Sequence, residues 1–240
     1  MKITYTSDLH LEFSSFEIKN DLGSEVLILA GDICPIVEKS RWEDFLHSTS
    51  DEFCKTFLVA GNHEYYHGDI KTSFTDLLEI TSNFKSVTVL NNSSEVYNGI
   101  GFYGSTLWTN FHNKPENMWL ADVYMNDGKY INNFSSEESV KLYNKTIEWL
   151  SEVKPEQETN IMISHHGLHA KCVSAGYASS RLNPAYFSNV DSVIINKFDY
   201  WVSGHSHSQL HYKVNDTLLL RNPRGYPGEC PGFELKYIEV

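Results

Sequence analysis

The sequence predicts an α/β fold, a four-layer α-β-β-α sandwich in which two mixed sheets pack face to face and helices cover both outer faces. Two observations carry this prediction. The first third of the 240 residues alternates strand-like and helix-like patterns, which is typical of a mostly parallel sheet. The later part contains short strand patterns separated by Asn-Asn and Asn-Gly turns, which favours mixed and antiparallel pairing in a second sheet.

The elements of the first third follow from the spacing of apolar residues. Short apolar runs predict strands over residues 3–7, 26–30 and 56–60. Two helices are expected from apolar residues that recur on one helical face. The first face contains Trp42, Phe45, Leu46 and Phe53, and the second contains Ile70, Phe74, Leu77 and Leu78.

The remaining two thirds of the chain contain more strands and one clear helix. Ser135 and Glu138 form a capping box, which predicts a helix whose apolar face carries Val140, Tyr143, Ile147 and Leu150. Strands are expected over residues 87–90, 95–97, 102–105, 160–164, 200–203, 218–220 and 234–238.

An aromatic and polar stretch over residues 106–134 has no periodicity that assigns it to a helix or a strand. Two interpretations of its aromatic side chains stay open. They pack in the core and the loops, which is the commoner arrangement, or they cap an active site and stack on a base. The residues concerned are Trp108, Phe111, Trp119, Tyr124 and Tyr130.

Composition indicates an ordinary globular chain, with 41% hydrophobic and 21% charged residues. We find no repeat, low-complexity tract or linker, and we therefore expect one domain over residues 1–240. The chain has no signal-peptide pattern and no apolar run long enough for a membrane span, so we predict a cytoplasmic location and no membrane partner. The formal charge of −12 disfavours non-specific nucleic-acid binding. Nothing in the sequence predicts the oligomeric state.

Metal-ligand residue types follow five of the predicted strands directly. In α/β sheets, sites gather beyond the carboxyl ends of the strands, so we expect these side chains to form one cluster. Glycines at positions 31, 61 and 204 allow the backbone to turn tightly there. The residues that follow the five strands are Asp8 and His10, Asp32, Asn62 to Glu64, His165 and His166, and His205 and His207.

This mixture of carboxylate, amide and imidazole groups without a thiolate suits two divalent transition metals, with Mn²⁺ preferred and Fe, Zn²⁺ or Ni²⁺ as alternatives. Two such ions about 3.5–4 Å apart can clamp a phosphoryl group and activate a water molecule. They would also make the pocket locally positive, roughly +2 after two aspartates are counted, in an otherwise acidic protein.

The motifs, in order along the chain, are D-x-H, G-D, G-N-H-E, a histidine after a strand, and G-H-x-H. Together they resemble the signature of the calcineurin-like metallophosphoesterases. Any one motif alone would be a weak signal, but all five lie in order over about 200 residues. The matching residues are Asp8, His10, Gly31-Asp32, Gly61 to Glu64, His165 and Gly204 to His207.

The resemblance implies a role for each matching residue. Asp32 would bridge the two ions. One ion would also be held by Asp8, His10 and His207, and the other by Asn62, His165 and His205. His63 would stay outside the ligand set as proton donor to the leaving group and as a phosphate contact. A hydroxide that bridges the metals would attack phosphorus.

Two departures narrow the class. Protein phosphatases of this superfamily continue G-D with Asp-Arg-Gly, whereas this chain continues Asp32 with Ile33, Cys34 and Pro35, so protein dephosphorylation is disfavoured. Pyrophosphohydrolases of the lipid A pathway carry arginine at the position of His63 and are disfavoured too. Small cytosolic phosphoesterases remain, including ones with a similar Asn-Pro-Arg-Gly-Tyr sequence, here residues 222–226.

Two further residues are candidates for substrate contact. His166 competes with His165 for the ligand role, or faces the substrate, or is only a neighbour. Arg224 contacts a substrate phosphate, or holds the C-terminal loop through hydrogen bonds to carbonyl or carboxylate groups.

The sequence therefore predicts an enzyme, a dinuclear-metal phosphoric ester hydrolase that acts on a phosphodiester or phosphomonoester of a small molecule or nucleotide. Two alternatives stay open. One is a nuclease, although no basic cluster supports it. The other is a non-catalytic binding module of the same fold, although such proteins usually lack several of the ligands found here.

Overall fold

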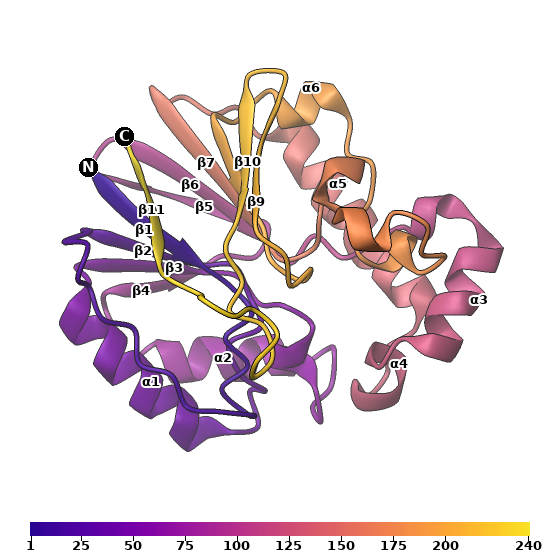
Figure 1. Cartoon of the computed structure of the whole chain (residues 1–240), viewed down its shortest axis with the longest axis horizontal. Helices are drawn as coiled ribbons and strands as arrows, with labels where there is room; N and C mark the ends of the chain where they lie inside the picture. The colour runs from indigo at the N-terminus through magenta and orange to yellow at the C-terminus, as the bar shows by residue number, and fades with distance from the viewer.

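The computed structural model describes residues 1–240, and its first sheet contains the strands predicted near the N-terminus (Figure 1). Its four parallel strands stand in sequence order, and the C-terminal strand is antiparallel at the edge. The sheet order is β11 (Lys236–Glu239), β1 (Lys2–Thr6), β2 (Val26–Leu29), β3 (Lys55–Leu58) and β4 (Val87–Val89).

The second sheet has four parallel strands at its centre and an antiparallel strand at each edge. Its edge strand β9 was not predicted, because that strand is largely exposed and lacks a buried apolar run. The order is β5 (Ser93–Tyr97), β6 (Ile100–Ser105), β7 (Thr159–Ser164), β8 (Tyr200–Val202), β10 (Thr217–Arg221) and β9 (Leu210–Val214).

Helices cover the outer face of each sheet (Figure 1). On the first sheet, α1 (Lys39–Glu52) buries Trp42, Phe45 and Leu46, as the periodicity predicted, and α2 (Ser73–Thr81) follows β3. The predicted face of α2 was partly wrong. Leu77 is buried as predicted, but Ile70 precedes the helix and Leu78 is exposed, because the helix turns Ile80 inward instead.

The second sheet is covered by α5 (Ser136–Glu152) and the short α6 (Ser192–Ile195). Ser135 caps the start of α5 as predicted, because its hydroxyl accepts a hydrogen bond from the Glu138 backbone N–H at 3.3 Å. The reciprocal bond of a full capping box is absent, since the Glu138 carboxylate pairs with Lys141 instead. The predicted four-layer sandwich of two mixed sheets is confirmed.

The space between the sheets is filled by apolar side chains from both. Ile28 and Phe57 come from the first sheet, and Phe102 and Ile161 from the second, and all four are fully buried. The rings of Phe57 and Phe102 stack with centroids 4.0 Å apart. Each such side chain contributes about 1.5–3 kcal/mol through removal from water, so this layer fixes the two sheets against each other.

The unassigned residues 106–134 form η2 (Phe111–Asn113), α3 (Pro115–Tyr124) and α4 (Asp127–Tyr130). In Figure 1, α3 and α4 project beyond the edge of the sandwich. The segment after β7 forms the short turns η3 (Ala170–Cys172), η4 (Ala175–Tyr177) and η5 (Asn183–Ala185). None of the helices has both the length and the continuous apolar character that crossing a bilayer requires.

Candidate metal centre

Groups of side chains that could ligate a metal occur in one region, beyond the carboxyl ends of the parallel strands. Three groups lie there, two of which share His10, and within each group the ligand atoms are within 4.8 Å of one another. They are Asp8, His10 and His207; His10, Glu12 and His63; and Asp32, His165 and His205.

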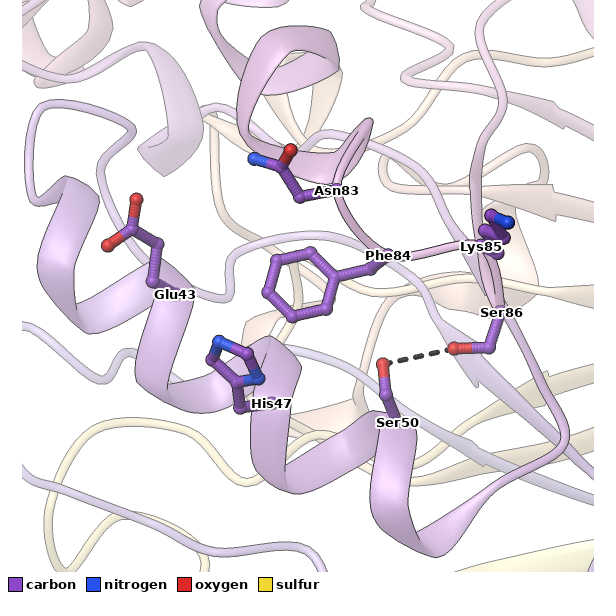
Figure 2. A pocket seen from close by; sticks show the side chains of 7 residues that line it. All are labelled: Glu43, His47, Ser50, Asn83, Phe84, Lys85 and Ser86. Atoms are coloured by element: carbon purple, nitrogen blue, oxygen red, sulfur yellow. Dashed lines mark hydrogen bonds between the residues drawn. The ribbon is translucent and has the colours of Figure 1, made fainter.

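A hollow that is separate from this region lies between α1 and the turn that follows α2 (Figure 2). Its lining includes Glu43, His47 and Phe84, and a hydrogen bond of 3.0 Å joins the hydroxyls of Ser50 and Ser86 beside it. None of these residues belongs to a group of potential metal ligands. The chemistry predicted from the strand ends therefore concerns the first region.

The backbone is strained where it delivers these side chains. Asp8, His10, Asp32 and His205 all have positive φ angles between 47° and 66°, a conformation that non-glycine residues adopt at a cost. Hydrogen bonds hold two of these turns together, from the Asp8 N–H to the Gly31 carbonyl and from the His10 N–H to the Asp32 carbonyl, at 2.9 and 3.1 Å. Such strain clusters at functional sites, where the surrounding structure maintains it.

Two glycines are needed because the turns approach one another closely. A Cβ atom on Gly61 would lie 2.2 Å from the Asp32 Oδ1 atom, and one on Gly31 would lie 2.5 Å from the His165 Nδ1 atom. Gly31 also has a φ of +86°. These positions therefore exclude a side chain, and they explain the glycine that precedes Asp32 and Asn62 in the motifs.

The first ligand set consists of Asp8, His10 and His207 and brings two imidazole nitrogens close to a carboxylate oxygen. The Nε2 atoms of His10 and His207 lie 3.0 Å apart, and the Asp8 Oδ1 atom lies 3.5 Å from His207 Nε2. The His10 Nδ1 atom faces Glu12, and the His207 Nδ1 atom faces Glu229 at 2.5 Å. A carboxylate on Nδ1 fixes the proton there and leaves Nε2 free to bind a cation, which is the usual environment of a metal-ligating histidine.

The second ligand set is built on the group of Asp32, His165 and His205. The His165 Nε2 atom lies 3.3 Å from the Asp32 Oδ2 atom and 3.0 Å from the Asn62 Oδ1 atom. The same Asp32 oxygen lies 3.9 Å from His10 Nε2, so this carboxylate stands between the two groups. The Asp32 Oδ1 atom accepts the His63 backbone N–H at 2.9 Å, which holds the carboxylate in place.

Asn62 and His205 complete the second ligand set, around Asp32 and His165. The Asn62 amide nitrogen donates to Asp127 at 2.9 Å and to the Tyr66 hydroxyl at 3.2 Å, which turns its oxygen toward His165. The His205 Nε2 atom is buried and has no hydrogen-bond partner. A buried polar atom without a partner is costly unless a ligand satisfies it. The donor set and this orphaned nitrogen fit divalent cations.

Electrostatics in the region also favour cations. Although burial opposes it, the Asp32 carboxylate raises the pKa of His165 to about 9, and Asp8 and Glu229 raise the pKa of His207 to about 9. Burial would raise the pKa of Asp32, but the neighbouring imidazoles of His165, His63 and His10 lower it well below its usual range. The pKa of Asp8 is lowered as well, so Asp8 and Asp32 stay ionised and attract positive charge, which either protons on the imidazoles or metal ions can supply.

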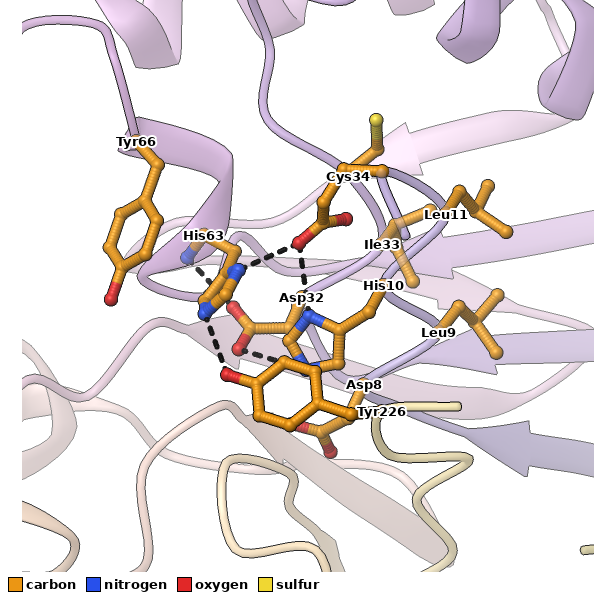
Figure 3. Close-up of polar contacts among 12 residues, drawn as sticks. Asp8, Leu9, His10, Leu11, Asp32, Ile33, Cys34, His63, Tyr66 and Tyr226 are labelled. Atoms are coloured by element: carbon orange, nitrogen blue, oxygen red, sulfur yellow. Dashed lines mark hydrogen bonds and ion pairs between the residues drawn. The ribbon is translucent and has the colours of Figure 1, made fainter. Parts of the chain in front are cut away.

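His63 lies beside both ligand sets (Figure 3), and with His10 and Glu12 it forms the remaining group. Its backbone N–H donates to Asp32, and its ring lies 4.4 Å from that of His10 between centroids. Its Nδ1 atom lies 2.8 Å from Glu12 Oε1, and its Nε2 atom lies 3.3 Å from the Tyr226 hydroxyl. Its ring stacks on Tyr66 with centroids 4.1 Å apart. Burial opposes it, but the charges of Asp32 and Glu12 raise the pKa of His63. The imidazole is therefore oriented, and its proton is favoured.

His166 and Arg224, the two candidates for substrate contact, have other contacts. The buried His166 ring directs Nδ1 to the Thr106 carbonyl at 3.3 Å and packs against Trp108, and burial lowers its pKa to about 3. The Arg224 guanidinium donates to the Leu9 and Ser14 carbonyls at 2.7 and 3.1 Å. The loop-holding alternative for Arg224 accounts for these contacts without a substrate.

Several residues that build the site were not predicted. Glu12 links the Nδ1 atoms of His10 and His63, at 3.2 and 2.8 Å, and its other oxygen is buried without a partner. Tyr226 packs on His10 at 4.4 Å between ring centroids. Only the position of Glu12, two residues after His10, could have drawn attention to it. Tyr226 ends the Asn-Pro-Arg-Gly-Tyr sequence of residues 222–226, but that resemblance assigned it no role. Tyr66, Asp127 and Glu229 belong to no motif.

Glu64 braces the turns that carry Asp32 and Asn62. Its carboxylate accepts the backbone N–H groups of Asp32, Ile33 and Gly61 at 2.9, 2.7 and 2.6 Å. The Glu64→Ala substitution leaves three buried donors unpaired, each at a cost of about 1–3 kcal/mol. We expect urea denaturation to give a free energy of unfolding lower by at least about 3 kcal/mol.

The matched control for this prediction is Glu79→Ala on the exposed face of α2, where alanine is an equally good helix former. Its midpoint of denaturation should stay close to that of the native chain. Equal midpoints for both variants would show that Glu64 does not hold the two turns together.

Comparison with known proteins settles the family. The model of the calcineurin-like phosphoesterase family matches residues 1–209. The chain belongs to this family. A related protein, an uncharacterized protein of Acanthamoeba polyphaga mimivirus, is 26% identical, and the match covers 99% of this chain and 96% of the viral protein.

Solved structures agree with the fold of this calcineurin-like phosphoesterase. The phosphopantetheinyl hydrolase of Mycobacterium tuberculosis superposes with a TM-score of 0.78 at 16% identity, over 99% of this chain and 95% of that one. A putative 5′-nucleotidase of Staphylococcus aureus superposes with a TM-score of 0.52 at 15% identity, over 93% of this chain and 49% of that one. At these identities the likeness establishes the fold, and the family membership establishes a phosphoesterase with a metal-binding site.

Proposed function

We propose that this phosphoesterase hydrolyses a phosphodiester or phosphomonoester of a small molecule or nucleotide at a centre of two divalent metal ions. The observation that carries the proposal is the convergence of both ligand groups on the Asp32 carboxylate, at 3.3 Å from His165 and 3.9 Å from His10. A single carboxylate between two sets of imidazoles suits two ions better than one. Both ions would bind there as Mn²⁺, with Fe, Zn²⁺ or Ni²⁺ as alternatives.

The ligand sets follow the two groups of side chains. Asp32 would serve both ions. Asp8, His10 and His207 would hold one ion, and Asn62, His165 and His205 the other. When bound, the ions would neutralise charge on the phosphoryl oxygens and activate a water molecule as nucleophile.

The protein itself would supply the proton for the leaving group. The His63 Nδ1 atom is engaged by Glu12, which leaves the Nε2 atom, 3.3 Å from the Tyr226 hydroxyl, as the donor. Because neighbouring carboxylates favour the protonated ring, His63 would enter the reaction as an acid. The tyrosine rings on both sides would keep it aligned.

The likeness to the structural neighbours establishes the fold alone, and their substrates are therefore no part of the proposal. A small-molecule ester is preferred over nucleic acid, since the net charge of −12 repels a polyanion. A cytoplasmic location and one domain over residues 1–240 are part of the same proposal.

Hydrolysis by chelator-treated protein with and without Mn²⁺ tests the proposal. We expect p-nitrophenolate release from bis(p-nitrophenyl) phosphate or p-nitrophenyl phosphate only after metal is restored. Faster digestion of single-stranded DNA or RNA than of these esters at physiological salt would favour the nuclease. The absence of both hydrolysis and bound metal under every loading condition would favour a binding module.

A further inference from the structure

A pocket of about 530 Å³ opens from the proposed metal centre. Its inner end is lined by Asp32, His63 and His205, which belong to the site described above. Its outer wall comes from two segments that carry no family motif, residues 124–126 at the end of α3 and residues 173–186 around η4 and η5. The wall therefore lies where the unreacted part of a bound ester would extend.

Tyrosines dominate this outer wall. Tyr124 and Tyr177 line the pocket and are 60% and 68% exposed, so much of each ring is open to a molecule bound there. Tyr186 continues the wall inward, and its ring lies 4.7 Å from that of His205 at an angle of 34°. The three rings thus lead from solvent to the proposed ligands and offer flat apolar faces for stacking.

The charged residues that line the pocket indicate which substituents a substrate can carry there. None of the residues that line it is lysine or arginine. Its acidic members are Asp32 at the inner end and Glu229, whose carboxylate contacts His207. Arg181 is exposed between the lining residues Ser180 and Leu182 but does not line the pocket. A second phosphate at the outer wall would therefore meet no lysine or arginine of the lining.

We propose that this wall is a subsite for an uncharged, planar ring, such as a nucleobase, on a substrate that carries a single phosphoryl group. The inference rests on the proposed phosphoesterase activity and adds the class of substrate to it. Stacking on Tyr124 and Tyr177 would supply affinity for the ring, and the absence of lysine and arginine from the lining disfavours a second phosphate. Asn126, an exposed residue at the same wall, offers an amide to the polar edge of the ring.

Three p-nitrophenyl esters test the subsite with Mn²⁺-loaded protein. They are methyl p-nitrophenyl phosphate, the p-nitrophenyl ester of thymidine 5′-phosphate, and the same thymidine ester with a further 3′-phosphate. We expect kcat/KM for the thymidine ester to exceed that for the methyl ester by about tenfold or more, as stacking on aromatic rings provides. The added 3′-phosphate should remove most of that advantage.

Variants assign the effect to the wall. Tyr177→Ala should raise KM for the thymidine ester about tenfold and leave the methyl ester unchanged, whereas Tyr177→Phe should behave as the native chain. Tyr177→Arg should improve the 3′-phosphorylated ester relative to the native chain. Tyr237→Ala, at an exposed tyrosine on β11 outside the pocket, is the matched control.

The outcomes separate this inference from the activity on which it rests. Equal kcat/KM for the methyl and thymidine esters, or a Tyr177→Ala variant that loses both equally, would overturn the subsite alone. A native chain that hydrolyses none of the three esters would overturn the proposed function, and the subsite with it.

Discussion

Asp32→Asn should lower metal-dependent hydrolysis of p-nitrophenyl esters by about a thousandfold or more, the largest loss we expect from any single substitution. The asparagine keeps the volume of the side chain and an oxygen to accept the His63 N–H. It removes the negative charge that stands between His165 and His10. Steady-state kinetics with saturating Mn²⁺ measures the loss, and circular dichroism checks the fold.

Asp21→Asn is the control for this variant, because Asp21 is exposed and remote from the three groups of potential ligands. It should hydrolyse the esters at the native rate. If Asp32→Asn also turned over normally, a centre of two ions that shares one carboxylate could not be the catalyst.

His63→Gln should lower kcat by about a hundredfold or more for an ester with an alkyl leaving group, while Mn²⁺ affinity stays unchanged. The reason is that His63 lies outside the proposed ligands and holds a proton toward the pocket. A p-nitrophenyl ester should suffer much less, since p-nitrophenolate leaves without protonation. Parallel kinetics on a thymidine methyl phosphodiester and its p-nitrophenyl analogue measures this difference.

His211→Gln, at an exposed histidine on β9, controls for the loss of an imidazole. It should match the native chain on both esters. An equal loss on both esters in His63→Gln would mean that the ring binds phosphate and does not protonate the leaving group.

The fold and the strand-end residues could be predicted for a common physical reason. Buried parallel strands such as Val26–Leu29 are short apolar runs, and the chain must turn at their ends with small residues such as Gly31. The residues that follow such turns can therefore be identified from the sequence alone. The strands, the turns and the order of the motifs sufficed to predict the sandwich, the family and one cluster of ligand types.

The walls of the site were not predictable in this way. Helix α3 projects from the sandwich and buries only Leu120 and Ala121, so it lacks the apolar stripe that reveals a packed helix. Of the aromatic side chains in that stretch, Trp108 and Phe111 are buried, as ordinary packing requires, whereas Tyr124 lines the pocket. The packing interpretation thus holds for Trp108 and Phe111, and the stacking interpretation stays a prediction for Tyr124.

The residues that hydrogen-bond to the predicted site residues lie far from them along the chain, so the sequence did not indicate them. Tyr226 meets His63 across 163 positions of the chain, and Asp127 holds Asn62 across 65. These contacts depend on how loops pack after the sheets have formed, which no local pattern encodes. The choice between His165 and His166 is of the same kind. Only the direction of each ring, toward Asp32 or toward the Thr106 carbonyl, distinguishes them.

The central claim is that seven side chains hold two metal ions that share Asp32. Anomalous diffraction at the manganese edge, from crystals grown with Mn²⁺, tests it most directly. We predict two peaks, one against Asp8, His10 and His207 and the other against Asn62, His165 and His205, both in contact with Asp32. A single peak, or peaks that lie away from Asp32, would contradict the claim.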